Sequence, residues 1–269
     1  MKQFSDNEKS PTTLQTVERA LAFLETVAQA RRPPRLKEVA QALGINVTTS
    51  YHLLNTLQLA GYVTRDADGT LRMGGRTAIL YQGLLRSFAL SRELAPVVAE
   101  LSASTGETAY IAALNREKVI IQALVEGNQA VRVTGLYVGF SGSEHIRASG
   151  KAVLAHLPDA MRDDMLRQCL PDPAAGELNA VFGELNRVRE QGWALDDGSF
   201  QEGVCCIAAP FFRSGGLVAG SVAVSAPAAR FAAARDAITD AVLGSAQQAS
   251  QIAGHDPGQL RTLGHLGAG

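Results

Sequence analysis

The sequence has few of the residues on which disulfide-linked, metal-binding or membrane-spanning proteins depend. It contains only three cysteines in 269 residues, too few and too irregularly spaced for a disulfide framework, which favours a reducing, cytoplasmic compartment. The five histidines and three cysteines show no metal-site spacing. No apolar stretch reaches the ~18–20 residues of a transmembrane helix, and the polar first residues do not resemble a signal peptide. We therefore expect no metal, no other cofactor and no membrane contact.

Charge is also scarce, at 19% of residues and a net charge of −1. Residues 1–75 carry nine Lys or Arg and seven Asp or Glu, whereas the remainder carries sixteen and nineteen. This mildly basic first part permits contact with DNA but does not demonstrate it.

The first part of the chain has a helical pattern. We expect residues 1–11 to be a disordered tail, followed by a helix from Thr12 to Ala30 with Thr13 as N-cap. Its predicted apolar stripe is Leu14, Val17, Leu21, Leu24 and Val27. A second helix over 36–43 ends at Gly44, and a third over 47–60 has Asn46 as N-cap and ends at Gly61.

A short turn and a hairpin complete this unit. The turn Gly44-Ile45-Asn46 joins the second and third helices, and YVTRDADGTLRM alternates around Asp68-Gly69, a strong hairpin signal. Residues 12–75 are therefore predicted to form a winged helix-turn-helix. Such a unit either inserts its third helix into a DNA groove or serves as a protein-interaction module.

The rest of the chain mixes helices and strands. A linker helix is expected at 76–90, a ligand-binding domain at 91–255 and a flexible Gly-rich tail at 256–269. The strand and hairpin signals predict an α+β fold with an antiparallel sheet and packed helices. The predicted helices cover about 94–104, 150–156, 163–169, 178–191 and 233–252. The predicted strands cover about 107–114, 118–126, 131–134, 193–196, 204–212 and 217–225.

Two segments are similar to catalytic motifs, but each lacks residues that its motif requires. A phosphate loop ending at Gly150-Lys151 would need glycine where His145 stands and Ser or Thr where Ala152 stands. The run GFSGS has Ser143 where a nucleophile elbow requires glycine. We expect no enzyme activity.

The adjacent cysteines in GVCCIAAP lie in a short apolar run that predicts a buried strand. Their side chains leave a strand on opposite faces, so Cys205 and Cys206 do not share a metal, and neighbouring residues are too close for a disulfide. They are either small buried hydrophobes or a pocket wall. Asp196 and Asp197 diverge for the same reason, leaving a solvated turn or a ligand contact as alternatives.

One segment has the properties of an anion site. Ala148, Ser149 and Gly150 precede a helix expected to begin near Lys151, and Arg147 lies beside them. Backbone amides at a helix start favour an anion such as a carboxylate. The alternative is an ordinary helix start with Arg147 exposed to solvent.

These segments together resemble one known family. LKEVAQALGINVTTSYHLLNTLQLAGYV is similar to the helix-turn-helix of the IclR family of bacterial transcriptional regulators. HIRASGKAVLAHLP, GWALDDGSFQEGVCCIAAPFF and GSVAVSAP are similar to its effector domain, and the resemblance extends over residues 12–255. It implies a DNA-binding domain, a linker helix and an effector domain related to GAF-type sensor folds. It also implies homodimers that often pair into tetramers, and no catalysis.

The resemblance also assigns site residues. The effector site would comprise Ala148, Ser149, Gly150, Asp196, Cys206, Ala223 and Ser225. Ala223 lacks a hydroxyl that relatives often have, and Arg147 stands where a small Ser or Thr is common. A guanidinium there suits an organic acid, with an aromatic acid as one candidate.

On the DNA side, the matching positions lie at the start of the third helix. They are Thr48, Thr49, Ser50 and His52, with His52 in place of the usual arginine; the expected phosphate contacts are Arg35, Arg65 and Arg72. With so few charges, two or four domains would have to bind the double-stranded operator together.

The function predicted from these features is a DNA-binding repressor of a catabolic operon, controlled by a small organic acid. The alternatives are an activator of the same class, or a ligand-binding module that uses its winged helix for protein contacts.

Overall fold

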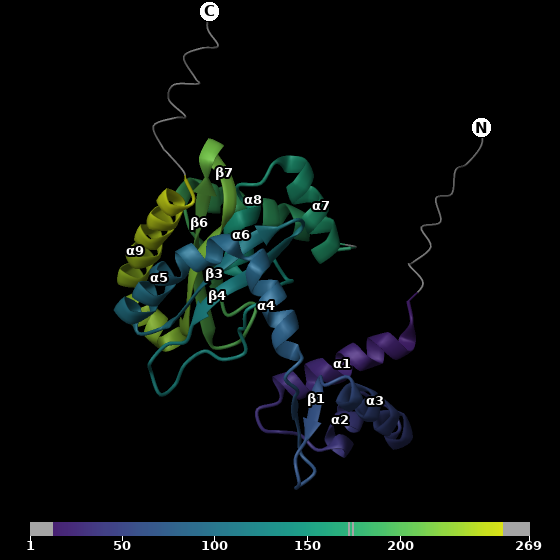
Figure 1. The fold of residues 1–269 in the computed structure, drawn as a ribbon. Helices are drawn as coiled ribbons and strands as arrows, with labels where there is room; N and C mark the ends of the chain where they lie inside the picture. The colour runs from purple at the N-terminus through teal and green to yellow at the C-terminus, as the bar shows by residue number, and fades with distance from the viewer. Residues whose placement is uncertain (1–12, 172, 174, 255–269) are drawn as a thin grey trace, which may run out of the picture. The chain divides into compact units, whose positions relative to one another are not determined.

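In the computed structural model (Figure 1), residues 13–254 are described, with the exception of residues 172 and 174. The tails predicted at 1–11 and 256–269 lie outside the described residues. The chain divides into two compact units between Ser87 and Phe88. This division falls inside the predicted linker at 76–90.

The N-terminal unit is a winged helix-turn-helix, as predicted. Its elements are α1 (Gln15–Gln29), α2 (Leu36–Ala42), α3 (Val47–Leu59), β1 (Val63–Arg65), β2 (Leu71–Met73) and α4 (Thr77–Ser87). β1 and β2 pair antiparallel to form the wing. At its tip, the Asp68 carboxylate accepts hydrogen bonds from the backbone N–H and the hydroxyl of Thr70.

The turn between α2 and α3 follows the local sequence signals. Gly44 has a φ of 63°, in the left-handed region that glycine adopts without steric cost. The Asn46 side chain accepts a hydrogen bond from the Thr49 N–H at 2.7 Å, which caps α3. The predicted N-cap of α3 is confirmed.

Only part of the predicted apolar stripe of α1, Leu24 and Val27, packs in the core. Phe23 and Val27 are its buried residues, whereas Leu14, Val17 and Leu21 are 73%, 52% and 55% exposed. The residue before the helix is Leu14, with no side-chain cap, so Thr13 is not the N-cap. Periodicity places Leu14, Val17 and Leu21 on one face correctly, but this unit's core covers a different face.

The C-terminal unit is an α+β domain built on one antiparallel sheet. Its strands are β3 (Thr108–Asn115), β4 (Lys118–Val125), β5 (Ala194–Asp197), β6 (Val204–Arg213) and β7 (Leu217–Pro227), in the order β4-β3-β7-β6-β5. Its helices are α5 (Ala89–Thr105), α6 (Ala148–Leu154), α7 (Asp159–Cys169), α8 (Ala175–Gln191) and α9 (Ala228–Ile252).

The sheet separates two hydrophobic cores. One face packs on α5 and α9, which run side by side (Figure 1). The other face packs on α6, with α7 and α8 outside it. Cys205 belongs to the first core and Cys206 to the second, which confirms that the two thiols leave β6 on opposite faces.

Several predicted boundaries need correction. Residues 131–134 form no strand; they lie in the irregular segment between β4 and α6. The helices α5 and α9 begin about five residues earlier than predicted, and α6, α7 and α8 also begin early. Alanine-rich starts such as 228–235 carry no distinctive cap, so the sequence contains no local mark of the first turn. Within the described residues, no helix is long and apolar enough to span a bilayer.

Candidate functional site

Strand pairing brings four of the predicted effector residues together. Asp196 on β5 lies opposite Cys206 on β6, and Cys206 lies opposite Ser225 on β7. The Cys206 Sγ and the Ser225 Oγ are 2.8 Å apart. Ala223 lies two residues before Ser225 and therefore on the same face, toward α6.

Helix α6 lies against this row of residues. Ala148, Ser149 and Gly150 are all buried, and the Ser221 hydroxyl of β7 donates to the Ser149 carbonyl at 3.0 Å. A Cβ at Gly150 would lie 2.3 Å from the Glu144 carbonyl oxygen. Gly150 is therefore required because the backbone of Glu144 passes directly over α6.

Arg147 lies inside the domain, at 3% exposure. Its guanidinium donates to the Gly142 carbonyl at 2.6 Å, the Val119 carbonyl at 3.1 Å and the Ser149 hydroxyl at 3.4 Å. The Phe140 ring is 5.0 Å away, and a Glu144 carboxylate oxygen 3.8 Å. The alternative of a solvent-exposed Arg147 is wrong. An arginine has five N–H donors, and these hydrogen bonds use three of them.

The two aspartates diverge, as predicted, and have different roles. Asp196 is buried, and its Oδ1 accepts from the backbone N–H groups of Ser199 and Phe200 at 2.9 and 3.2 Å. Burial raises the pKa of its carboxyl group, although these two N–H groups oppose the shift. Asp197 is exposed and accepts from the Cys205 thiol at 3.0 Å. Asp196 therefore holds the turn that carries Phe200 and is not a solvated turn residue.

Three aromatic residues of the site were not predicted. Tyr110 on β3 is buried beside Ser149 and Ser225, and its pKa is raised, first by burial and then by the neighbouring Cys206. Phe140 and Phe200 pack edge to face at 5.8 Å. The sequence signal for Tyr110 was a polar hydroxyl within the apolar run ETAYIAAL. Only the pairing of β3 with β7 brings it to Ser225.

The thiols are poor nucleophiles. Burial raises the pKa of Cys206 to about 12 and that of Cys205 to about 11, so both are protonated at neutral pH. Cys206 is thus a small, weakly polar part of the wall. Across the described ranges, no group of three or more His, Cys, Asp or Glu residues is placed to hold a metal ion.

In the winged helix, most predicted DNA contacts face solvent. Thr48 and His52 are exposed and Thr49 is half-buried. Ser50 is fully buried, and its hydroxyl donates to the Asn46 carbonyl at 3.0 Å. Its burial removes Ser50 from the set of candidate contacts. Tyr51 and Asn55, which we did not predict, are exposed on the same helix.

The predicted phosphate contacts are also at the surface. Arg35, Arg65 and Arg72 are all exposed. Arg72 pairs with Asp66 of the wing at 2.7 Å, which offsets part of its charge. Arg35 and Arg65 are therefore the better placed of the three for a phosphate.

Two family models match this arrangement of domains. The IclR helix-turn-helix domain matches residues 16–67, and the bacterial transcriptional regulator IclR C-terminal domain matches residues 82–251. The chain belongs to the IclR family. It is a DNA-binding transcriptional regulator with a C-terminal effector domain, as its sequence resemblance implied.

Two named regulators are similar to this IclR-family protein over most of their length. The HTH-type transcriptional regulator BhcR of Paracoccus denitrificans is 31% identical, over 88% of this chain and 86% of BhcR. The DNA-binding transcriptional repressor YiaJ of Escherichia coli is 28% identical, over 85% of this chain and 83% of YiaJ.

Solved structures share the fold. The IclR protein of Thermotoga maritima superposes with a TM-score of 0.70 at 22% identity, covering 89% of this chain and 99% of that one. An IclR homolog from Microbacterium hydrocarbonoxydans, complexed with 4-hydroxybenzoate, has a TM-score of 0.66 at 20% identity, over 88% and 98% of the two chains. At these identities the likeness concerns the fold alone.

Proposed function

We propose that this IclR-family regulator represses a catabolic operon and releases its operator when a small aromatic carboxylic acid binds beside Arg147. The observation that carries the proposal is a buried guanidinium that uses three of its five N–H donors in hydrogen bonds, next to Cys206, Ser225 and Tyr110. The naming of YiaJ as a repressor supports the direction of control.

The chemistry of this interior suits a carboxylate on a ring. A guanidinium pairs with a carboxylate through two parallel hydrogen bonds, and it does so most strongly where water is excluded. Phe140 and Phe200 add ring faces and edges at the same place. The 4-hydroxybenzoate complex of the Microbacterium relative is a precedent for this ligand class in that protein. No catalytic step is proposed, because both buried thiols are protonated at neutral pH.

Calorimetric titration with 4-hydroxybenzoate tests the ligand class, with 4-hydroxybenzyl alcohol as a probe that lacks the carboxylate. We expect the acid to bind at least tenfold more tightly, since a charge-assisted pair contributes about 1.5–3 kcal/mol. Arg147→Lys should lose most of this preference. Arg132→Lys is the matched control, because Arg132 is exposed and pairs with Glu126 at the surface. Equal affinities of the wild type for the two probes would contradict the proposal.

We propose that Thr48, Thr49 and His52 enter the major groove and that Arg35 and Arg65 contact phosphates, while Arg72 stays paired with Asp66. Hydroxyls and an imidazole can contact base edges, while arginines fix the register on the backbone. Mobility shifts with the protein's own upstream region, with and without the acid, test this. His52→Ala should weaken the specific shift, and the acid should reverse it. A shift that the acid strengthens would instead indicate an activator.

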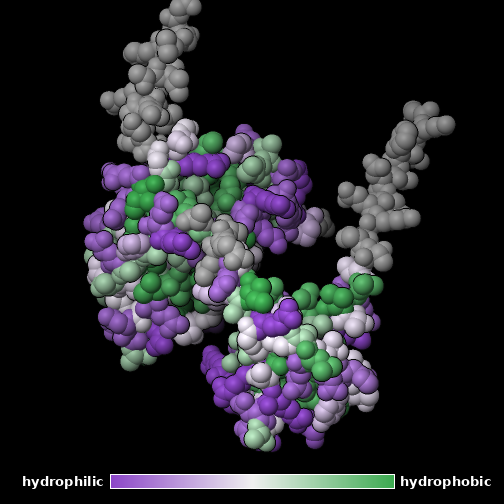
Figure 2. Space-filling view, viewed as in Figure 1, coloured by the Kyte–Doolittle hydropathy of each residue, from purple (hydrophilic) through white to green (hydrophobic). Residues whose placement is uncertain are grey.

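We further propose that the protein is a homodimer, with tetramers formed by pairs of dimers. Apolar side chains gather along α1 and the start of α4 (Figure 2), where Leu14, Val17, Leu21, Ile79, Leu80 and Tyr81 are exposed. Surfaces of this kind mark interaction sites. Light scattering after size exclusion should give a dimer for the wild type and a smaller species for Leu21→Glu. Leu59→Glu is the control, because Leu59 is a single, 92% exposed leucine on α3. A Leu21→Glu protein that keeps the wild-type mass would exclude this surface.

A further inference from the structure

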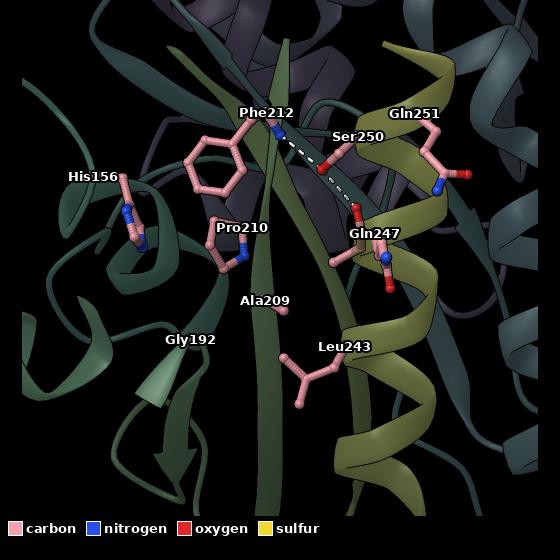
Figure 3. A pocket seen from close by; sticks show the side chains of 10 residues that line it. His156, Gly192, Ala209, Pro210, Phe212, Leu243, Gln247, Ser250 and Gln251 are labelled. Carbon is pink, nitrogen blue, oxygen red and sulfur yellow. Dashed lines mark hydrogen bonds between the residues drawn. The ribbon is translucent and has the colours of Figure 1, made fainter. Parts of the chain in front are cut away.

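A cavity lies in the C-terminal unit, at an open edge of the sheet. It has a volume of about 330 Å³ and lies between β6, α9 and His156, two residues after the end of α6 (Figure 3). Phe212 and Pro210 separate His156 from the side chains of α9. The lining residues are His156, Gly192, Ala209, Pro210, Phe212, Leu243, Ala246, Gln247, Ser250 and Gln251. None of these described residues belongs to the site around Arg147.

The edge of β6 at this cavity is not suited to an added strand. β5 pairs with β6 only as far as Ala208, so the following residues have β7 as their single strand partner among the described elements. Pro210 has no N–H, and the Phe212 N–H donates to the Ser250 hydroxyl at 3.0 Å. Ser250 in turn donates to the Ala246 carbonyl at 2.8 Å. With these groups occupied, the cavity favours a compact ligand over an extended peptide.

His156 contributes a polar atom without a partner to a cavity whose lining also includes Gln247, Ser250 and Gln251. Its Nε2 is buried and has no hydrogen-bond partner among the described residues. The ring packs edge to face on Phe212, with centroids 5.2 Å apart. Burial lowers the pKa of His156, and the neighbouring Arg189 lowers it further, so the imidazole is neutral at pH 7. A buried polar atom without a partner is costly and calls for an explanation.

We propose that this cavity is a second ligand site, which binds an uncharged ring compound carrying one hydroxyl group, of the phenol class. The lining has no charged side chain to pair with an ion, and the volume is at the small end of ligand pockets. A hydroxyl both donates and accepts, so it pairs with Nε2 in either tautomer of the neutral ring. The ring of the ligand would then lie against Phe212 and Pro210, which stand between His156 and α9.

The site is connected to the one around Arg147 by two elements. Helix α6 begins at the Arg147 site with Ser149 and ends next to His156. Strand β6 carries Cys206 at one site and Phe212 at the other. Phenol binding does not depend on the identity of the proposed acid effector, so the two proposals can fail separately.

Methyl NMR of the full-length protein, labelled at alanine and leucine methyls, tests the proposal with phenol and toluene as probes. Toluene has the same ring with a methyl group in place of the hydroxyl. We expect saturable shifts at Leu243 and Ala246, an unshifted Ala223 at the Arg147 site, and about tenfold tighter binding of phenol, the effect of one hydrogen bond to a buried group. Equal affinity of the two probes, shifts at Ala223 instead, or no saturable shift would overturn the proposal.

The variant His156→Phe removes the ring nitrogens and keeps an aromatic ring against Phe212. It should bind toluene as the wild type does and lose the tenfold advantage of phenol. His52→Phe, on the exposed face of α3, is the matched control and should keep that advantage. If His156→Phe retained the preference for phenol, the assignment of the hydroxyl to Nε2 would be wrong. If this variant does not fold, the comparison of phenol with toluene on the wild-type protein still tests whether the cavity binds a hydroxyl-bearing ring.

Discussion

Gly150 is one of the glycines whose replacement the structure tolerates poorly. A Cβ there would lie 2.3 Å from the Glu144 carbonyl oxygen and 2.4 Å from its Cα, both backbone atoms that cannot rotate away. We expect Gly150→Ala to lower the free energy of unfolding by about 2–4 kcal/mol. Gly183→Ala on α8, where a Cβ meets nothing within 4 Å, should raise it by about 0.5–1 kcal/mol. Urea denaturation measures both free energies of unfolding. A Gly150→Ala protein as stable as the wild type would show that Glu144 does not pass over α6 so closely.

The half-buried His156 makes stability depend on pH. Its pKa is lowered below the ordinary 6.5, first by burial and then by Arg189. A base with a lowered pKa in the folded state contributes stability that is present above pH 6.5 and is lost as the pH falls through the folded value. We expect the free energy of unfolding to fall between pH 7 and about pH 5. His156→Phe should show a smaller fall in the same urea titrations, and an identical fall would show that His156 is not responsible.

At the scale of elements, one ion pair joins the start of β3 to the start of α9. The Glu107 carboxylate is buried and accepts two hydrogen bonds from the Arg230 guanidinium, one of them 2.7 Å long. Arg230→Met would leave that carboxylate unpaired and should lower the free energy of unfolding by more than the loss of a surface ion pair does. Adding Glu107→Gln should recover part of this loss. Arg132→Met, which breaks a surface pair with Glu126, should cost less than about 1 kcal/mol in the same denaturation experiment. Equal costs would show that Glu107 is better solvated than its burial indicates.

Helix α1 shows why an apolar pattern on one element is ambiguous. Its residues form two apolar faces, one containing Phe23 and Val27 and the other Leu14, Val17 and Leu21. The first packs in the core of the winged helix. The second stays at the surface, and its proposed partner is another copy of the chain.

For the whole molecule, the small number of cationic DNA contacts predicts a shallow salt dependence. Arg35 and Arg65 are exposed on each winged helix, while Arg72 is paired with Asp66. A homodimer would then neutralise about four phosphates. The logarithm of the binding constant should fall against the logarithm of the salt concentration with a slope of about −4. Fluorescence anisotropy over a series of KCl concentrations measures this slope. Arg65→Gln should reduce it by about 2, since each dimer has two copies. A much steeper slope would show that charges elsewhere on the chain contact the DNA.

Local signals were sufficient to predict the winged helix and the faces of β6. Gly44, Asn46 and the Asp68-Gly69 hairpin act through their own backbone geometry, so no distant part of the chain is needed to interpret them. The alternation of a strand likewise separates Cys205 from Cys206 whatever lies on either side. Residues 131–134 and the early starts of α5 and α9 lacked such signals and were placed wrongly.

The sequence by itself determined the family, the order of the elements and the residues that share a face. Only the tertiary structure decided which face is covered and which strands are neighbours. Pairing of β3 with β7 brought Tyr110 to Ser225, burial of Arg147 decided between an internal donor and an exposed cation, and packing removed Ser50 from the DNA-binding face. The physical reason is that periodicity is a property of one element, whereas burial depends on partners far away in the chain.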